Sequence, residues 1–283
     1  MEMGWVRRQM AAWLTAAALG ATATAASAQV ARNIEECQAR DATVDSLIVN
    51  CTVAIKSGKL SPQQEARAFL NRGTAFFERR QYSLALRDYG FAERLDPNLA
   101  AVFANKANTY QRMGEHDRAI AEYDRALSIA PDDTPSLIGK GGAQLRLGRN
   151  EAAASTFSRA ISVDPQNATA HYNRGLANTR ARRYSNAVDD FTAALRIAPE
   201  DAEAMANRAR ALELGGELNA AYQDYSRAIA LDEGYSYAWY RRGRMLLDDG
   251  NNAEGNRDLA RAYNLGYDDP WLAEYINTLG RGG

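Results

Sequence analysis

The residue types that usually carry catalytic or metal chemistry are scarce in this sequence. Its 283 residues include 2 histidines, His116 and His171, and 2 cysteines, Cys37 and Cys51. Two cysteines without a nearby histidine leave a tetrahedral zinc shell half empty, so we predict no metal site. The segment GKGG at 139–142 lacks the spacing of a phosphate-binding loop. Because no nucleophile, base and orienting group can be assembled, the sequence predicts a protein that is not an enzyme and takes no cofactor.

The first 28 residues have the three-part organisation of a secretory signal peptide. Arg7 and Arg8 precede an apolar, Ala-rich stretch, and residues 26–28 read Ala-Ser-Ala, a small-x-small cleavage site. A retained membrane anchor is the alternative, but the apolar run is short and is interrupted by Gly20. We therefore expect cleavage after about Ala28, and an exported mature chain without a stable membrane anchor.

Behind this segment the chain repeats itself every 34 residues, from residue 66 to residue 269. Each block has small residues at positions 8, 20 and 27 and a bulky residue at position 24, and the first four blocks have proline at position 32. Glycine near position 15 of most blocks predicts a helix end there. Each block should therefore form two antiparallel helices, and such hairpins bury their apolar faces only by stacking.

This pattern resembles the tetratricopeptide repeat. The resemblance implies an all-α fold, a right-handed α-solenoid of antiparallel helix hairpins. Gln144 and Asn178 depart from it, because they stand at position 11, where an aromatic residue is usual. The six expected repeats are residues 66–99, 100–133, 134–167, 168–201, 202–235 and 236–269.

The two ends of the array resemble capping elements. CTVAIKSG at 51–58 matches FTAALRIA at 191–198, so residues 29–65 are interpreted as a degenerate first repeat. In that repeat Cys37 and Cys51 would face each other, and a disulfide closing a loop of this size is worth about 3 kcal/mol. Two buried free thiols are the alternative. Residues 270–283 read as a capping helix and tail, with Trp271 and Tyr275 on its inner face.

Two charged positions recur in phase with the repeat. Position 7 is basic in all six blocks, and position 23 is acidic in five of them. The hairpin should bring the two positions together, which predicts a row of salt bridges within the repeats; if they are exposed, each contributes about 0–1 kcal/mol. A basic stripe for an acidic ligand is the alternative. The position-7 residues are Arg72, Lys106, Lys140, Arg174, Arg208 and Arg242, and the acids are Asp88, Glu122, Asp190, Asp224 and Asp258.

Position 6 carries asparagine in four blocks. In the resembled repeats this position lines the concave surface made by the first helices. An asparagine side chain offers both donors and an acceptor, so a row of them could hold the backbone of an extended peptide. The alternative, bonding within the array, remains open. These residues are Asn71, Asn105, Asn173 and Asn207.

Aromatic and arginine side chains accompany the asparagines in the last three blocks, as is typical of interface hot spots. They predict a protein or peptide partner with an acidic end near the last two repeats. The net charge of −1 offers no footprint for nucleic acid. The predicted groove residues besides the asparagines are Tyr172, Arg210, Tyr237, Tyr240, Arg241 and Arg244.

Together these observations predict an exported, non-catalytic scaffold that binds a partner protein or extended peptide in its concave groove. The alternative is a structural component of a cell-envelope assembly that packs through its convex face or its ends. The signal segment, the cysteine pair and the repeats together resemble exported repeat proteins of Gram-negative bacteria, which implies a periplasmic or secreted location.

Overall fold

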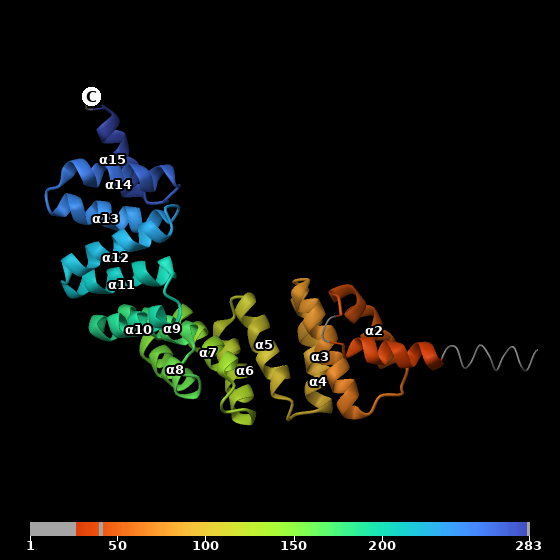
Figure 1. Cartoon of the computed structure of the whole chain (residues 1–283). Coiled ribbons are helices and arrows are strands. Elements are labelled where there is room, and N and C mark those ends of the chain that lie inside the picture. Colours follow the sequence, from red (N-terminus) through yellow and green to blue (C-terminus); the bar gives the residue numbers. More distant parts are fainter. Residues whose placement is uncertain (1–26, 40–41, 282–283) are drawn as a thin grey trace, which may run out of the picture. The chain divides into compact units, whose positions relative to one another are not determined.

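The computed structural model describes residues 27–39 and 42–281, and over these residues all regular secondary structure is helical (Figure 1). The predicted signal peptide lies outside the described residues apart from Ser27 and Ala28, which begin a helical stretch that runs to Cys37. None of the described helices is long and apolar enough to span a bilayer.

The chain divides into two compact units between Pro131 and Asp132. The first contains the helical stretch 27–37 followed by α2 (Val44–Lys56), α3 (Pro62–Glu78), α4 (Tyr82–Leu95), α5 (Ala100–Arg112) and α6 (His116–Ile129). The second contains α7 (Thr134–Arg146), α8 (Asn150–Val163), α9 (Ala168–Arg180), α10 (Tyr184–Ile197), α11 (Ala202–Gly215), α12 (Leu218–Leu231), α13 (Ser236–Asp248), α14 (Asn252–Asn264) and α15 (Pro270–Arg281). In each unit successive helices pair as hairpins, and each hairpin packs on the next.

Small residues let the two helices of a hairpin approach closely. In the α9–α10 hairpin a Cβ atom added to Gly175 would lie 2.8 Å from the ring of Phe191. Phe191 is fully buried and packs with Ala187 and with Ala211 of the next hairpin. The residue at position 24 therefore fills the space left by the small residue at position 8 of the same hairpin. The all-α architecture of stacked hairpins is confirmed.

The turn inside each hairpin imposes a left-handed backbone at position 15. Gly148 has φ 71° there, and in repeat 4 the same position is held by Arg182 with φ 59°. A side chain in this region costs about 1–2 kcal/mol. A glycine avoids that cost but loses about 0.5–1 kcal/mol of chain entropy.

We expect Arg182→Gly to raise the free energy of unfolding by about 0.5–1 kcal/mol, because it removes the left-handed strain. The matched change Gly148→Ala, at the same turn of repeat 3, should lower it by a similar amount. Urea unfolding of both variants measures the two effects. If Arg182→Gly and Gly148→Ala changed the free energy of unfolding in the same direction, this account of the turn would be wrong.

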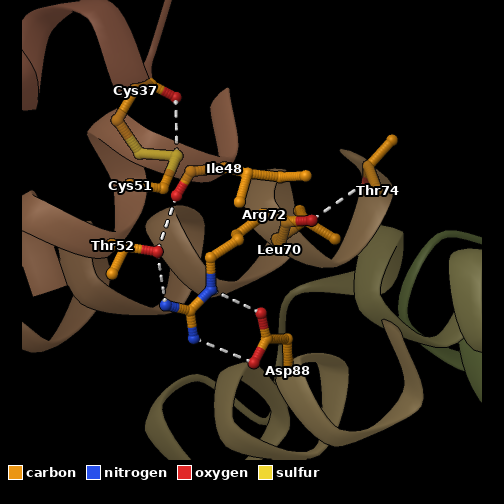
Figure 2. Close-up of polar contacts among 8 residues, drawn as sticks. All are labelled: Cys37, Ile48, Cys51, Thr52, Leu70, Arg72, Thr74 and Asp88. Atoms are coloured by element: carbon orange, nitrogen blue, oxygen red, sulfur yellow. Dashed lines mark hydrogen bonds and ion pairs between the residues drawn. A yellow bond between two sulfur atoms is a disulfide. The ribbon is translucent and has the colours of Figure 1, made fainter. Parts of the chain in front are cut away.

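A disulfide fixes the N-terminal cap. Cys37 and Cys51 are bonded, with Cα atoms 4.8 Å apart, and both are buried. Figure 2 shows this bond close to α3, where Arg72 reaches both Thr52 of α2 and Asp88 of α4. The disulfide therefore joins the two helical segments of the cap to each other. Side-chain hydrogen bonds then link the cap to the first full hairpin.

The C-terminal helix α15 closes the other end. Leu272 is the residue that α15 buries, against Tyr240, Leu259 and Ala262. Of the two residues predicted for this inner face, Tyr275 is partly buried against the same cluster, whereas Trp271 stays 38% exposed, with its ring 4.9 Å from that of Tyr275.

Candidate functional site

The arginines at position 7 bind the aspartates at position 23 of the same hairpin. The shortest nitrogen–oxygen distances are 2.7 Å for Arg72–Asp88, 2.6 Å for Arg174–Asp190, 2.7 Å for Arg208–Asp224 and 2.7 Å for Arg242–Asp258. The predicted salt bridges within the repeats are confirmed for these four hairpins and for repeat 2, where Lys106 lies 2.6 Å from Glu122. These bridges occupy the guanidinium groups, which argues against a basic stripe.

Each of these arginines also joins its hairpin to the preceding one. Its Nη1 donates to a hydroxyl at position 25 of the preceding second helix, at distances of 3.0–3.2 Å. One guanidinium thus connects three helices. The hydroxyl residues are Thr52, Ser158, Thr192 and Ser226.

Repeat 2 makes the same pair with a lysine that also contacts a second acid, and repeat 3 lacks the acid at position 23. Lys106 lies between Glu93 and Glu122, at 2.9 and 2.6 Å. Burial opposes the charge of Lys106, but these two carboxylates outweigh it and raise the pKa of the ammonium group. In repeat 3 position 23 is Thr156, whose hydroxyl donates to Gln144 at 2.8 Å. Repeat 3 thus departs from the pattern at two positions that contact each other: Gln144 replaces the usual aromatic residue at position 11, and Thr156 replaces the acid at position 23.

The aspartates are more deeply buried than the sequence analysis assumed. The side chain of Asp88 is fully buried, and that of Asp190 is 4% exposed and also accepts from Asn178 at 2.8 Å. The energies of exposed pairs therefore do not apply, since breaking a buried pair leaves an uncompensated charge. These pairs belong to the framework that holds the hairpins together.

The asparagines at position 6 lie on the first helices of the hairpins, and three of the four already use their amide nitrogen. The Nδ2 of Asn71 donates to the carbonyl of Cys37 at 2.8 Å, and that of Asn105 donates to Thr74 at 3.1 Å. The Nδ2 of Asn207 donates to Tyr172 Oη at 3.0 Å and to the Glu203 carbonyl at 2.9 Å.

The oxygen atoms of the same side chains are not engaged. No described residue donates to the Oδ1 atoms of these three asparagines, and the Asn173 side chain makes no hydrogen bond within the described part of the chain. All four side chains are partly accessible. All four thus present an open acceptor, whereas both donors of Asn207 are used and Asn173 keeps donors and acceptor alike.

Tyr172 and Glu203 form a polar contact beside Asn207. The Tyr172 hydroxyl donates to Glu203 Oε1 at 2.6 Å. Burial and the Glu203 carboxylate raise the pKa of the Tyr172 phenol, so it stays a neutral donor. The predicted groove residues Tyr172 and Asn207 are therefore brought together, and an acid that the sequence analysis had not selected joins them.

Two of the predicted groove arginines share a single carboxylate. Arg210 lies 2.9 Å from Glu213, and Arg241 contacts the same carboxylate. The hydroxyl of Tyr225 also donates to Glu213, at 2.9 Å. Burial opposes the charge of Arg241, but Glu213 outweighs it and raises the pKa of the guanidinium group. Glu213 thus neutralises one of the two charges expected to attract an acidic ligand.

Arg244 differs from both, since no carboxylate within the described residues pairs with it. Its guanidinium carbon lies 4.0 Å from the centre of the Trp271 indole, and its Nη1 donates to Tyr240 Oη at 3.2 Å. Contact with an aromatic ring holds a guanidinium in place without neutralising it. Arg244 is therefore a positioned, unpaired cation at the C-terminal end of the first-helix face, the surface formed by α9, α11 and α13.

Tyr240 is not available to a ligand. It is 6% exposed, its ring lies 4.4 Å from that of Tyr267, and it packs on Leu272. We therefore reassign it from the groove to the core. Tyr237 stays partly accessible, with its ring 6.0 Å from that of Tyr235.

No group of three or more His, Cys, Asp or Glu side chains among the described residues is placed to hold a metal ion. His171 is buried at position 4, with Nε2 3.1 Å from the Pro165 carbonyl, which is a packing arrangement.

The position-25 hydroxyls were missed although a sequence signal existed. Ser158, Thr192 and Ser226 recur at the same 34-residue interval as the arginines. Glu203 and Glu213 had no such signal, because each occurs in one repeat only.

Comparison with known proteins agrees with the geometry. One sequence model of the tetratricopeptide repeat matches residues 138–202 and 180–236, and a second matches residues 100–133. No curated protein sequence matches the chain.

Solved structures share the fold at low sequence identity. YrrB, described as a TPR protein with an unusual peptide-binding site, is 19% identical with a TM-score of 0.60, over 68% of this chain and 97% of that one. MamA is 20% identical with a TM-score of 0.57, over 59% of this chain and 92% of that one. A tetratricopeptide repeat protein from Parabacteroides merdae is 19% identical with a TM-score of 0.59, over 83% of this chain and 91% of that one. With the stacked hairpins and the phased positions 7, 8, 23 and 24, these matches show that the chain carries tetratricopeptide repeats.

Proposed function

We propose that the protein is an exported, non-catalytic scaffold that binds an extended segment of a partner protein along its first-helix face. The observation that carries the proposal is the set of open Oδ1 acceptors on Asn173 and Asn207, whose side chains stand on successive first helices. Backbone N–H groups of an extended segment are the donors that such acceptors require. The peptide-binding site named for YrrB supports the same use of the fold.

The charges on this face favour an acidic end of the ligand beside α13. Arg210 and Arg241 share Glu213, and Arg244 has no acidic partner among the described residues, so these three guanidinium groups share one carboxylate; Glu203, the other acid noted on this face, accepts from Tyr172. Trp271 and the Tyr240 hydroxyl position the Arg244 guanidinium, and its remaining N–H groups can donate to both oxygens of a ligand carboxylate.

Export is part of the proposal. Its support is the signal-like sequence before residue 29 and the buried Cys37–Cys51 disulfide, since such bonds persist in oxidising compartments. The periplasm of a Gram-negative cell, or the secreted fraction, is the expected location. Cell fractionation with an antibody against the chain tests it, and a purely cytoplasmic signal would contradict it.

The binding test compares two double variants. We expect the double variant Asn173→Ala with Asn207→Ala to bind a captured partner with about tenfold lower affinity, because two hydrogen bonds of about 0.5–1.5 kcal/mol each are lost. The matched control changes the exposed Asn186 and Asn219, which lie on second helices, and should leave binding unchanged. The measurement is capture from cell extract, followed by calorimetric titration of the identified partner.

Equal binding by both double variants would show that the asparagines serve only the framework. It would favour the alternative function, an envelope component that packs through its second helices or its ends.

A further inference from the structure

Two open pockets lie at equivalent places in the C-terminal unit, two repeats apart, and each is bounded by two second helices and the first helix between them. The second-helix pocket, between α12 and α14, has a volume of about 510 Å³. The comparison pocket, between α8 and α10, has a volume of about 380 Å³. Both lie over a position-7 arginine and its aspartate, Arg242–Asp258 in the first and Arg174–Asp190 in the second.

The walls of the two pockets differ in chemistry. Tyr222 and Trp239 flank the second-helix pocket, with ring centres 5.9 and 5.0 Å from the Arg242 guanidinium carbon. Trp239 is held in place because its Nε1 donates to the Glu233 carbonyl at 3.0 Å. The corresponding wall of the comparison pocket is formed by Ala154, Ser155 and Ser158. Only the second-helix pocket of these two therefore offers aromatic surface.

The charges differ as well. The second-helix pocket is lined by three arginines and two acids, Glu254 and Asp258, whereas the comparison pocket is lined by two arginines and three acids. Asp258 is occupied by Arg242, and Glu254 approaches Arg257 only to 3.6 Å. Arg261 has no acidic partner among the described residues. The second-helix pocket thus keeps an excess of positive charge.

The spacing of the two outer arginines suits a protein segment. Arg257 and Arg261 are one helical turn apart on α14, so their side chains stand about 6 Å from each other. Alternate side chains of an extended peptide are about 6.6–6.8 Å apart on one face. A segment of the form acid-x-acid can therefore pair with both, and the next residue on that face would reach Tyr222 and Trp239.

We propose that the second-helix pocket is a second docking site, which binds an extended acidic segment of a partner protein with an apolar aromatic residue beside the acids. The site is independent of the proposed function. Arg241 of α13 reaches Glu213 on the first helix α11, whereas Arg242 and Trp239 line the space between the second helices. The protein could therefore hold two partners, or two segments of one partner, at once.

Two tryptophans make the two sites separately observable. Trp239 lies in the second-helix pocket and Trp271 lies against Arg244. The chain has 4 tryptophans, and Trp239→Phe and Trp271→Phe each remove one indole N–H signal from an NMR spectrum, which assigns both. The probe is the peptide acetyl-Glu-Ser-Glu-Ser-Phe-amide, added to the full chain.

We expect the Trp239 signal to shift saturably with this probe. Arg257→Ala with Arg261→Ala should weaken the binding at least about fivefold, and replacing the Phe of the probe by Ala should weaken it by a similar factor. Arg183→Ala, in the comparison pocket, should change nothing.

Three results would overturn the proposal. In the first, the Trp271 signal shifts while the Trp239 signal stays, which places the probe at Arg244 and leaves the proposed function standing. In the second, sulfate shifts Trp239 as strongly as the peptide, which reduces the pocket to a general anion site. In the third, an oligoglucuronate binds more tightly than the peptide, which makes it a carbohydrate site.

Discussion

Asp88→Ala should lower the free energy of unfolding of the N-terminal unit by about 3–5 kcal/mol, because it leaves a buried guanidinium without its counter-charge. The Asp88 side chain is fully buried and accepts from Arg72 Nε at 2.7 Å and from Nη2 at 3.0 Å. Arg72 is itself only 13% exposed, and its remaining polar contact is the Thr52 hydroxyl. Figure 2 shows the three groups together.

The measurement is urea unfolding of the full chain, with amide hydrogen exchange of α3 and α4 to localise the loss. Repeat arrays lose stability hairpin by hairpin, so exchange should quicken near the substitution first. The matched control is Glu115→Ala, which breaks the exposed Arg118–Glu115 pair at 2.6 Å. Its effect should stay within about 0.5 kcal/mol.

A double variant separates the charge from the packing. Arg72→Met together with Asp88→Ala removes both charges, and we expect it to be less destabilised than Asp88→Ala alone, because no unpaired ion is left. If Asp88→Ala cost no more than Glu115→Ala, the pair would behave as a surface salt bridge and this account would fail.

Reduction of the Cys37–Cys51 disulfide should cost about 3 kcal/mol, since it frees a closed loop in the unfolded chain. The bond joins the end of the helical stretch 27–37 to α2, and Asn71 Nδ2 holds the Cys37 carbonyl at 2.8 Å. With the bond open, that hydrogen bond, the contacts of Asn50 with Asn33 and Glu36 at 3.0 and 2.6 Å, and a small buried cluster are left to hold the segment. Amide exchange of residues 27–37 should therefore rise on reduction, while exchange in α13 and α14 stays unchanged.

A variant without the bond provides the control. Cys37→Ser with Cys51→Ser should match the reduced protein and should respond no further to a reductant. Equal exchange of residues 27–37 in the oxidised and reduced protein would show that packing alone holds the cap. In that case the hydrogen bond from Asn71 to the Cys37 carbonyl would persist in both the oxidised and the reduced protein.

The stacked hairpins could be predicted from the sequence because every determinant recurs at one interval. A small residue such as Gly175 and a ring such as Phe191 are 16 residues apart, inside a single hairpin whose geometry is set by local helix formation. The same separation joins Arg208 to Asp224, so the salt bridges were also predictable. Pairing within one hairpin depends little on how hairpins stack.

The chemistry of the first-helix face was decided by contacts between hairpins. Arg241 meets Glu213 across 28 residues, and Asn207 meets Tyr172 across 35, at single places in the array that no periodic pattern marks. Arg244 finds Trp271 only because α15 turns back onto α13.

The sequence by itself determined the repeat, its helix pairs and the charge pairs of five hairpins, because these follow from periodicity and local geometry; it also placed the two cysteines on facing helices, while leaving two free thiols open. Tertiary structure alone decided which acceptors stay open, which cation stays unpaired and that Tyr240 is core. The physical reason is that stacking places each side chain against neighbours from another hairpin, and hydrogen bonds and burial depend on those neighbours.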